Sequence, residues 1–586
     1  MNVRRYQKWA KSGLAIMLAG AMMVGTAASG GGMTAQAAET ESSDTVSTQK
    51  AVTSDAASLL FTEKHITSDL TLPTIGASGT TISWKSSNPS VLSNEGKVTR
   101  PKKGAADEEV TLKGTVKMGD YAKARKFAFV VLAESEMGPT KEFALDQVEL
   151  LDDYYLTAQN SDIEFLKKFD NDRLLSRFRE TAGLDTKGIA PYGGWEDGWL
   201  GGHSVGHYLT AIAQAVKATG NADLKEKSKQ LIEGLAECQN KLGTGFIFGA
   251  KIETEGYVEK QFDILEGKTT GKTWVPWYNM HKMLTGLVDT YKYTGNKQAL
   301  EVAKKLGDWI YNRVSKWDAG TQGRVLGTEY GGMNDCLYEL YLCTRDSKHL
   351  EAAHKFDQPN LYKTVAKGGK NCLNGKHANT TIPKFLGALK RYVVLEQTGE
   401  LTKDDEAYLT NVEKFFDIAV TRHAYITGGV SVMEHFRKDK NQDGTRTQTN
   451  CESCCAHNML KMAKELYKVT GDKKYADYYE TTLRNSIMGA VKSESGAAAY
   501  FIPMATGYFK TFGNEDPAKN MFWCCTGSGM ENFTKLGDSI YFHANDTLIV
   551  NQYVSSKVTW EEKNLVVTQK SDVTKSDKAT FTVNAK

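Results

Sequence analysis

The chain has 586 residues, with 73 lysines and arginines against 70 aspartates and glutamates, so its formal net charge is only +3. The two signs are interspersed, whereas a nucleic-acid-binding protein concentrates its basic residues in a patch or stripe. We therefore exclude a nucleic-acid partner. At about 150 residues for each domain, the length predicts about four domains.

The first 38 residues have the organisation of a secretory signal peptide. A basic start at residues 4–11 precedes an apolar core at residues 13–28 and a small-residue cleavage site at residues 35–37. Glycines interrupt this core, and no later stretch of the sequence is apolar enough to span a bilayer. We expect a mature protein that is secreted or held at the cell surface, without stable membrane insertion. Residues 39–49 are rich in Ser, Thr and acids and predict a disordered spacer.

Residues 50–135 form a run of short alternating segments that predicts a small β-sandwich, with Trp84 in its core. The segment Ser83-Trp-Lys-Ser-Ser-Asn-Pro-Ser90, followed by Gly96-Lys-Val98, resembles the degenerate bacterial immunoglobulin-like modules that accompany secreted carbohydrate enzymes. The resemblance implies a spacer or accessory module.

Residues 140–542 have apolar residues at helical spacing and contain an internal repeat. Amphipathic segments end in Thr-Gly at residues 219–220, 294–295, 398–399 and 470–471, and Thr344-Arg345-Asp346 is a fifth copy with arginine in the glycine position. Glycine allows a left-handed helix C-cap, after which a return helix begins. Such helical hairpins close most simply into a ring of inner and outer helices. We predict a mainly α fold with an (α/α)6 barrel, and an open helical solenoid is the alternative.

Histidine, asparagine and aromatic residues recur at the same end of these hairpins. Imidazoles, amides and aromatic faces suit the hydroxyl groups and rings of sugars. We predict that six of these residues line one rim of the barrel and bind a carbohydrate: Trp195, His203, His207, His281, Asn334 and His377. His203 and His207 also have a metal-binding spacing, but no glutamate follows His203 as an HExxH zinc site requires.

Five of the nine cysteines lie in two short runs, Thr449-Asn-Cys-Glu-Ser-Cys-Cys-Ala-His457 and Trp523-Cys-Cys-Thr-Gly-Ser-Gly529. Adjacent cysteines suit disulfides poorly, and an odd total leaves one thiol over. Thiolates and carboxylates are good zinc ligands. Two zinc sites are then possible around the Cys524-Cys525 pair. Cys451-x-x-Cys454 completes a closed structural site, whereas Glu452-x-Cys454 completes one in which a thiolate is also a nucleophile.

Taken in order, these motifs resemble the β-L-arabinofuranosidase family, glycoside hydrolase family 127, and its near relative family 146. The resemblance is carried by Tyr192-Gly-Gly-Trp-Glu196, Gly202-His-x-x-Gly-His-Tyr208, Tyr278-x-x-His281-Lys282, Tyr330-Gly-Gly-Met-Asn334, His377-Ala-Asn-Thr-x-Ile-Pro-Lys384, Tyr425-Ile-Thr-Gly-Gly429, Glu452-x-Cys454 and Cys524-Cys525. It implies that a Zn²⁺ ion is bound by Glu452, Cys454, Cys524 and Cys525. It also implies that Cys524 is the catalytic nucleophile, that Glu434 is the general acid/base, and that His281 and His377 bind the substrate.

The implied chemistry is coherent on physical grounds. A free thiol has a pKa near ~8.5 and is mostly protonated at neutral pH, whereas a zinc-bound thiol is deprotonated. Glu434 would protonate the leaving oxygen and then activate water, which is a retaining double displacement with cysteine in place of the usual carboxylate nucleophile.

The leading hypothesis is a secreted retaining exo-glycosidase that releases β-linked L-arabinofuranose, or a related furanose, from plant glycans or glycoproteins. One alternative is a carboxylate-only hydrolase or a lyase with a structural zinc. Another is a non-catalytic glycan-binding surface protein. Residues 543–586 alternate as strands and predict the start of a C-terminal β-sandwich, for which we favour truncation over packing against the barrel.

Overall fold

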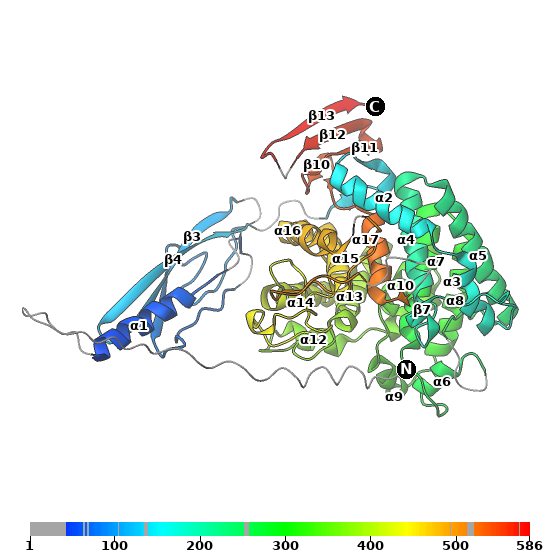
Figure 1. The fold of residues 1–586 in the computed structure, drawn as a ribbon, viewed down its shortest axis with the longest axis horizontal. Coiled ribbons are helices and arrows are strands. Elements are labelled where there is room, and N and C mark those ends of the chain that lie inside the picture. Colours follow the sequence, from blue (N-terminus) through cyan, green and yellow to red (C-terminus); the bar gives the residue numbers. More distant parts are fainter. Residues whose placement is uncertain are drawn as a thin grey trace, which may run out of the picture. The chain divides into compact units, whose positions relative to one another are not determined.

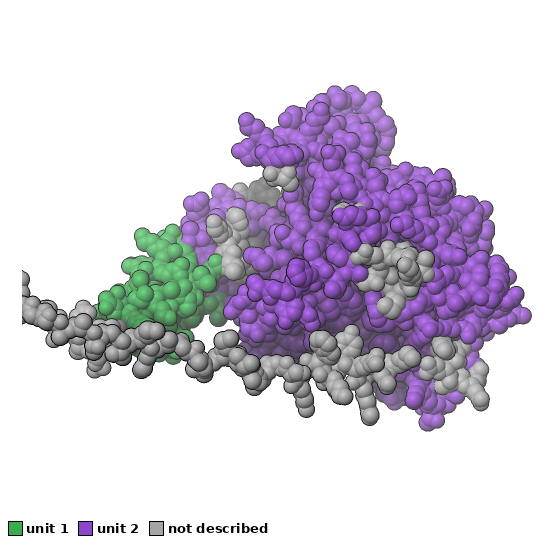
Figure 2. All heavy atoms as spheres, in the orientation of Figure 1, with its two compact units in different colours: residues 1–62, 71–87, 111–127 green, residues 63–70, 88–110, 128–586 purple. Residues whose placement is uncertain are grey.

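The computed structural model describes residues 43–61, 65–66, 69–102, 105–133, 139–250, 257–492, 494–512, 521–572 and 575–586. The predicted signal peptide, residues 1–38, lies outside the described residues. The chain divides into two compact units, which Figure 2 colours separately. Every residue of the candidate site belongs to the larger unit.

The N-terminal module contains a four-stranded sheet in the order β1-β4-β3-β2. Its strands are β1 His65–Ile66, β2 Thr81–Ser86, β3 Glu108–Met118 and β4 Tyr121–Val131. Ile82 and Val116 are buried on this sheet, and the Trp84 ring packs beside them. Trp84 is thus only partly buried beside this cluster, whereas the sequence predicts it within the core.

Helix α1, Ser43–Ser58, corrects the predicted disordered spacer at residues 39–49. Its Val52 and Ala56 side chains are buried in the same apolar cluster as Ile82. The segment is ordered from Ser43 onward because these two small apolar residues, one helical turn apart, cover the sheet.

Six inner helices form a closed ring, in which each helix packs against the next and the last packs against the first. In order they are α4 His203–Thr219, α7 Pro276–Thr294, α10 Met333–Thr344, α13 Ala378–Thr398, α15 Ser453–Thr470 and α17 Cys524–Thr534 (Figure 1). Their outer partners, in the same order, are α5 Ala222–Leu242, α8 Lys297–Val314, α11 Ser347–Lys355, α14 Glu406–His423, α16 Lys473–Thr482 and α2 Asp153–Lys167. The contact between α17 and α4 confirms the (α/α)6 barrel and excludes the open solenoid, whose ends would not meet.

Shorter elements connect these helices. They are α3 Asn171–Thr181, α6 Lys260–Leu265, α9 Ala319–Leu326, α12 Pro359–Ala366, the single turns Trp195–Asp197, Asp443–Thr445, Leu483–Ile487 and Met488–Ala490, and the paired strands β7 Gly193–Gly194 and β8 Met521–Phe522. None of the helices in the described part of the chain combines the length and apolar content that crossing a bilayer needs.

The Thr-Gly repeats form the helix ends that the sequence predicts. Gly220, Gly295 and Gly471 are C-caps with φ of 70°, 72° and 65°, in the left-handed region that glycine tolerates best. Arg345 takes the same conformation, with φ of 55°, at the end of α10. The next residue caps the following outer helix, as when the Asn221 side chain accepts a hydrogen bond from Leu224 N–H at 3.0 Å. Four of the five repeats therefore encode both the stop of one helix and the start of the next. After Thr398-Gly399 the next outer helix, α14, begins only at Glu406.

Two glycines let the inner helices α4 and α7 pack backbone against backbone. A Cβ atom on Gly206 would lie 2.1 Å from the Lys282 carbonyl oxygen, and one on Gly286 would lie 2.5 Å from the Gly206 carbonyl oxygen. No side chain fits at either position. This crossing fixes the spacing of the histidines that the two helices carry.

The C-terminal strands form two sheets with strands that precede the barrel. One sheet has the order β10-β9-β5 and the other β13-β12-β11-β6. The strands are β5 Lys141–Glu142, β6 Val148–Leu150, β9 Tyr541–Ala544, β10 Thr547–Val550, β11 Ser556–Trp560, β12 Leu565–Ser571 and β13 Ala579–Ala585, with short turns at Leu145–Gln147 and Glu561–Lys563. Residues 141–150, which the sequence analysis assigns to the barrel, therefore belong to these sheets. Val558 and Trp560 share a buried cluster with residues of the barrel helices, so the strands pack against the barrel.

Candidate active site

The first turns of the inner helices meet at one rim of the barrel. Cys454 near the start of α15 and Cys525 near the start of α17 have their sulfur atoms 3.1 Å apart. His281 of α7 accepts a hydrogen bond at 3.0 Å from the N–H of Gly332, which caps α10. Helix N-termini carry partial positive charge, so this rim favours anions and thiolates.

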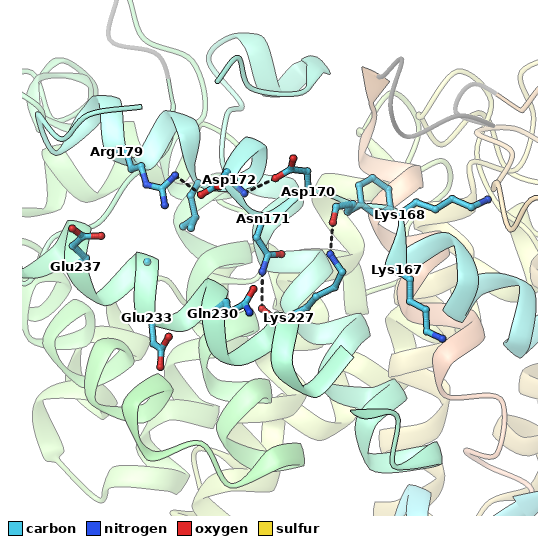
Figure 3. Close-up of a pocket in the computed structure, with 13 residues that line it drawn as sticks. Lys167, Lys168, Asp170, Asn171, Asp172, Arg179, Lys227, Gln230, Glu233 and Glu237 are labelled. Atoms are coloured by element: carbon cyan, nitrogen blue, oxygen red, sulfur yellow. Dashed lines mark hydrogen bonds and ion pairs between the residues drawn. The ribbon is translucent and has the colours of Figure 1, made fainter. Parts of the chain in front are cut away.

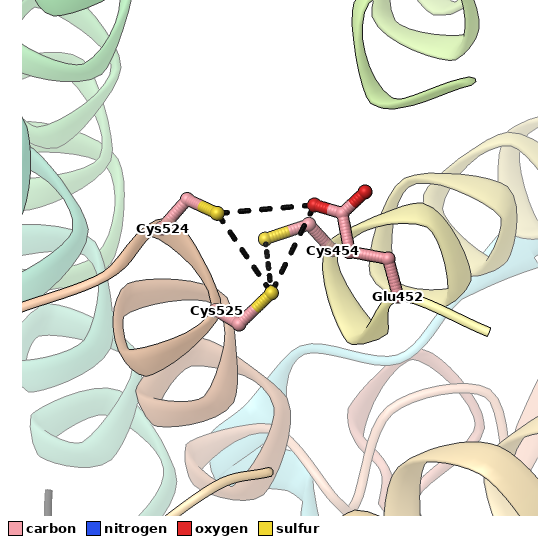
Figure 4. Close-up of side chains that lie close together, drawn as sticks. All are labelled: Glu452, Cys454, Cys524 and Cys525. Atoms are coloured by element: carbon pink, nitrogen blue, oxygen red, sulfur yellow. Dashed lines mark hydrogen bonds between the residues drawn. The ribbon is translucent and has the colours of Figure 1, made fainter. Parts of the chain in front are cut away.

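Glu452, Cys454, Cys524 and Cys525 form a compact buried cluster, in which all four candidate ligand atoms lie within 4.8 Å of one another (Figure 4). The Cys524 sulfur is 3.8 Å from both the Cys525 sulfur and Glu452 Oε1. A tetrahedral zinc ion with ~2.3 Å bonds to sulfur places neighbouring sulfurs about 3.8 Å apart. The four residues that the sequence predicts as metal ligands are therefore brought together. The Cys524–Cys525 distance matches the spacing for zinc, whereas the Cys454–Cys525 distance of 3.1 Å is shorter.

Electrostatics also favour a cation in this cluster. Burial raises the pKa of the Cys454, Cys524 and Cys525 thiols well above the usual range. Burial and the nearby Glu434 carboxylate raise the pKa of Glu452 to about 8. Four acidic groups that resist ionisation together are the donor set that a divalent cation stabilises, since its charge replaces their protons.

Cys451 does not belong to the cluster. Its sulfur contacts the Thr427 hydroxyl at 3.8 Å, and its side chain packs in a separate apolar group with Ala490 and Ile502. The backbone of Cys451 is left-handed, with φ of 51°, and this turn separates it from the ligand that follows. The geometry therefore excludes the closed four-thiolate site. All nine cysteines are free, so the geometry also gives no support to disulfides.

Glu434 lies across from Cys524, on the loop between α14 and α15. Its carboxylate accepts hydrogen bonds from His377 Nε2, at 3.3 Å, and from the Tyr500 hydroxyl. The same Tyr500 oxygen lies 3.4 Å from the Cys524 sulfur. One phenol therefore bridges the predicted nucleophile and the predicted acid/base.

The protonation state of the His377–Glu434 pair follows from the cap of α13. Thr380 N–H donates to His377 Nδ1 at 3.1 Å, so the ring proton resides on Nε2 and points at Glu434. The hydrogen bond from His377 is the main cause that lowers the pKa of Glu434, and Tyr500 lowers it further against the effect of burial. Burial is the largest single influence on His377 and opposes its protonation, but Glu434, Glu329 and Glu452 together outweigh burial and raise the pKa of the imidazole. Before substrate binds, the Glu434 carboxylate is thus held in its ionised form, and it must take up a proton before it can act as an acid.

Two further predicted histidines offer unused ring nitrogens. His281 has its proton on Nε2, because Nδ1 accepts from Gly332, and this N–H has no partner among the described residues. His207 donates through Nδ1 to Glu531, which leaves Nε2 without a partner in the described part of the chain. Burial lowers the pKa of His207 to about 4, so the ring is neutral at neutral pH. Both rings suit hydrogen bonding to an uncharged ligand.

The remaining predicted residues have different surroundings. His203 is fully buried, with Nδ1 2.7 Å from the Leu200 carbonyl and 2.8 Å from Glu196 Oε1, and Asn334 is fully buried with its amide donating to Asp357 at 2.9 Å. Both side chains are engaged within the protein, and substrate contact for them stays a prediction. Trp195 is half-buried and packs against the cysteine cluster.

Comparison with known proteins agrees with this geometry. A model of the GH127 catalytic domain of β-L-arabinofuranosidases matches residues 147–538, which is more than half of the chain. The chain belongs to the GH127 family. It is therefore a glycoside hydrolase of the arabinofuranosidase type. Residues 47–134 match the atrophied bacterial immunoglobulin domain, which confirms the predicted N-terminal module.

Two solved GH127 structures share the fold of this chain. A GH127 β-arabinofuranosidase aligns with a TM-score of 0.57 at 19% identity, covering 74% of this chain and 68% of its own. A GH127 β-L-arabinofuranosidase from Geobacillus stearothermophilus T6 aligns with a TM-score of 0.54 at 17% identity, covering 74% of this chain and 72% of its own. At these identities the likeness establishes the fold. No curated protein matches the chain in sequence.

Within this GH127 site, sequence analysis missed Tyr500 and Glu329. Tyr500 lies in the irregular segment 491–512, which has no repeat, cap or metal-ligand spacing to single it out. Glu329 is close enough to His377 for the imidazole to lower its pKa, although burial dominates and raises it. Its position directly before the Tyr330-Gly-Gly motif is the one signal that the sequence offers.

A hollow of about 610 Å³ lies away from the GH127 site, on the outer side of the barrel. It is bordered by the end of α2, the start of α3 and one face of α5, and its walls carry Lys167, Asp172, Arg179, Lys227 and Glu233 (Figure 3). None of the predicted site residues lines it. Several of its charged side chains already have partners, as Arg179 has Asp172 at 2.7 Å and Lys167 has Glu164 at 2.9 Å, so the cysteine rim remains the candidate site.

Proposed function

We propose that this GH127 protein is an exported, retaining exo-β-L-arabinofuranosidase with a zinc-bound cysteine nucleophile. Glu452, Cys454, Cys524 and Cys525 hold the zinc, Cys524 attacks the sugar, and Glu434 is the general acid/base. The substrate is β-linked L-arabinofuranose at the ends of plant glycans or glycoprotein glycans.

The observation that carries this proposal is the shared contact of Cys524 and Glu434 with Tyr500. Because both groups lie within hydrogen-bonding reach of one hydroxyl, they are no more than about 6 Å apart. Retaining glycosidases hold nucleophile and acid/base about 5–5.5 Å apart, whereas inverting enzymes need about 6.5–9.5 Å to accommodate a water molecule. The spacing therefore favours double displacement.

The reaction needs two steps from the residues of the chain. In the first, the Cys524 thiolate forms a bond to the anomeric carbon while protonated Glu434 gives its proton to the leaving oxygen. In the second, Glu434 takes a proton from water, the hydroxide bonds to the same carbon, and the thiolate leaves. Bound zinc would supply the positive charge that keeps the sulfurs deprotonated. The Nε2–H of His281, which has no partner among the described residues, suits hydrogen bonding to a hydroxyl of the bound sugar.

Replacement of Cys524 by alanine and by serine tests the proposal, with Cys451→Ala as the matched control, since Cys451 is buried nearby but outside the cluster. Release of nitrophenol from nitrophenyl β-L-arabinofuranoside is measured with and without a chelator. The amount of zinc bound to each variant is measured separately. We expect both Cys524 variants to lose turnover with the fold retained, and Cys451→Ala to remain active.

The alternatives give different results. Full activity in Cys524→Ala would exclude the cysteine nucleophile and favour a carboxylate hydrolase or lyase with structural zinc. Absence of hydrolysis of every arabinofuranoside, combined with tight glycan binding, would favour a non-catalytic glycan-binding surface protein.

A further inference from the structure

Cys455 is a buried thiol that neither the metal cluster nor the proposed reaction uses. It directly follows the ligand Cys454 and is fully buried. Its sulfur lies 3.2 Å from Oε2 of Glu452. A thiol is a donor and an ionised carboxylate is only an acceptor, so the S–H group points at the carboxylate.

The two oxygens of Glu452 face different thiols. Oε1 lies 3.8 Å from the sulfurs of both Cys524 and Cys525, on the side where the metal would sit. Oε2 faces Cys455, on the opposite side of the carboxylate. Glu452 occupies the N-cap position of α15, yet its side chain makes no capping hydrogen bond, so the helix does not hold the carboxylate in place.

Helical geometry separates the roles of the adjacent pair Cys454-Cys455. Successive residues of an α-helix project about 100° apart, so Cys454 and Cys455 point in different directions from α15. Cys454 faces α17, with its sulfur 3.1 Å from that of Cys525 and 3.0 Å from the Ser528 hydroxyl. Cys455 therefore projects toward the preceding Glu452 side chain instead.

We propose that Cys455 is a positioning residue for the metal site, whose thiol fixes Oε2 and thereby presents Oε1 as the single oxygen ligand. The terminal torsion of a glutamate is broad and roughly two-fold, so an untethered carboxylate can rotate and offer either oxygen or both. The tether keeps the site at three sulfurs and one oxygen. This inference rests on the zinc site of the proposed function and adds a residue to it.

The test is zinc affinity, measured by competition with a chromogenic chelator on protein stripped of metal and reloaded. The wild type is compared with Cys455→Ala, with Cys455→Ser, which restores a donor, and with the control Cys451→Ala, which removes the other flanking thiol. Loss of an outer-layer hydrogen bond to a metal ligand weakens metal binding about 10–100-fold. We expect that loss in Cys455→Ala, most of the affinity back in Cys455→Ser, and wild-type affinity in the control.

A second readout is the visible spectrum of the cobalt-loaded protein. We expect Cys455→Ala to keep the thiolate-to-cobalt bands and to shift the ligand-field bands, because only the coordination by the Glu452 oxygens changes. Unchanged zinc affinity in Cys455→Ala, or equal loss in Cys455→Ser, would overturn the role of Cys455. If Cys455→Ala does not fold, Cys455→Val fills the space without a donor and decides the question by the same titration. A wild-type protein that binds no zinc would instead contradict the proposed function itself.

Discussion

Replacement of Gly206 by alanine is expected to damage the active site without touching any residue in it. The new Cβ would lie 2.1 Å from the Lys282 carbonyl oxygen and 2.8 Å from the Met283 nitrogen, and both are backbone atoms that cannot rotate away. To restore an ordinary contact of 3.4 Å, helices α4 and α7 must separate by 1.3 Å at this point. Overpacking of this kind costs about 1–3 kcal/mol.

The separation would act on catalysis because both helices carry site residues. Gly206 directly precedes His207 on α4, and Lys282 directly follows His281 on α7. A misplacement of about 1 Å costs about 100-fold in rate. We therefore expect Gly206→Ala to lower the Tm and to lower kcat/KM for nitrophenyl β-L-arabinofuranoside about 100-fold.

The matched control is Gly323→Ala in the short connecting helix α9, where a Cβ meets nothing within 4 Å. Alanine is preferred to glycine in a helix interior by about 1 kcal/mol, so this variant should keep its activity and gain stability. Wild-type Tm and wild-type kcat/KM in Gly206→Ala would refute the close crossing of α4 and α7.

Three further predictions concern pH and stability. His377→Asn keeps an acceptor for the cap of α13 but removes the hydrogen bond that lowers the pKa of Glu434. The fall of kcat/KM at alkaline pH should therefore move to higher pH. A fall at the same or at lower pH would argue against Glu434 as the acid. Arg345→Gly relieves a left-handed residue with φ of 55° and should raise the free energy of unfolding by about 1 kcal/mol in urea titrations, whereas a decrease would show that the contact of Arg345 with the Tyr341 ring outweighs the backbone strain. Burial raises the pKa of Asp162, whose carboxylate has no hydrogen-bond partner among the described residues. The free energy of unfolding should therefore fall as the pH rises from 3.8, the ordinary pKa of an aspartate, toward the raised pKa of Asp162 in the folded protein. Asp162→Asn should flatten that fall in denaturant titrations at several pH values, and an identical pH profile would contradict the assignment.

The parts of the fold that sequence predicts best are those with local causes. The Thr-Gly repeats specify left-handed caps because glycine alone has no steric penalty there, and Gly220, Gly295 and Gly471 adopt them. Helical hairpins of similar length that repeat along the chain can pack side by side in few ways, and the simplest is a closed ring of inner and outer helices. The metal cluster is equally local, since Glu452-x-Cys454 and Cys524-Cys525 each lie within one helical turn of an inner helix start.

The rest depends on contacts between distant segments. Tyr500 reaches Glu434 and Cys524 from a loop without periodicity, so no spacing rule identifies it. The sequence could not tell the role of Cys451 from that of Cys455. The difference follows from the left-handed backbone at Cys451, a conformation that a residue other than glycine rarely adopts and that the sequence does not indicate. His203 shows that a polar residue in a predicted binding motif can have its partner inside the protein. Its imidazole pairs with Glu196, and the sequence does not reveal that contact.

The most direct test of the account is the identity of the residue that carries the sugar between the two steps. Glu434→Gln removes the base for the second step, and an activated nitrophenyl β-L-arabinofuranoside needs little acid assistance for the first, so the intermediate should accumulate. Acid quenching, proteolysis and mass spectrometry then locate the pentose. We predict a pentosyl adduct on Cys524, whereas an adduct on a carboxylate, or turnover that inverts the anomeric centre without any adduct, would contradict the cysteine mechanism.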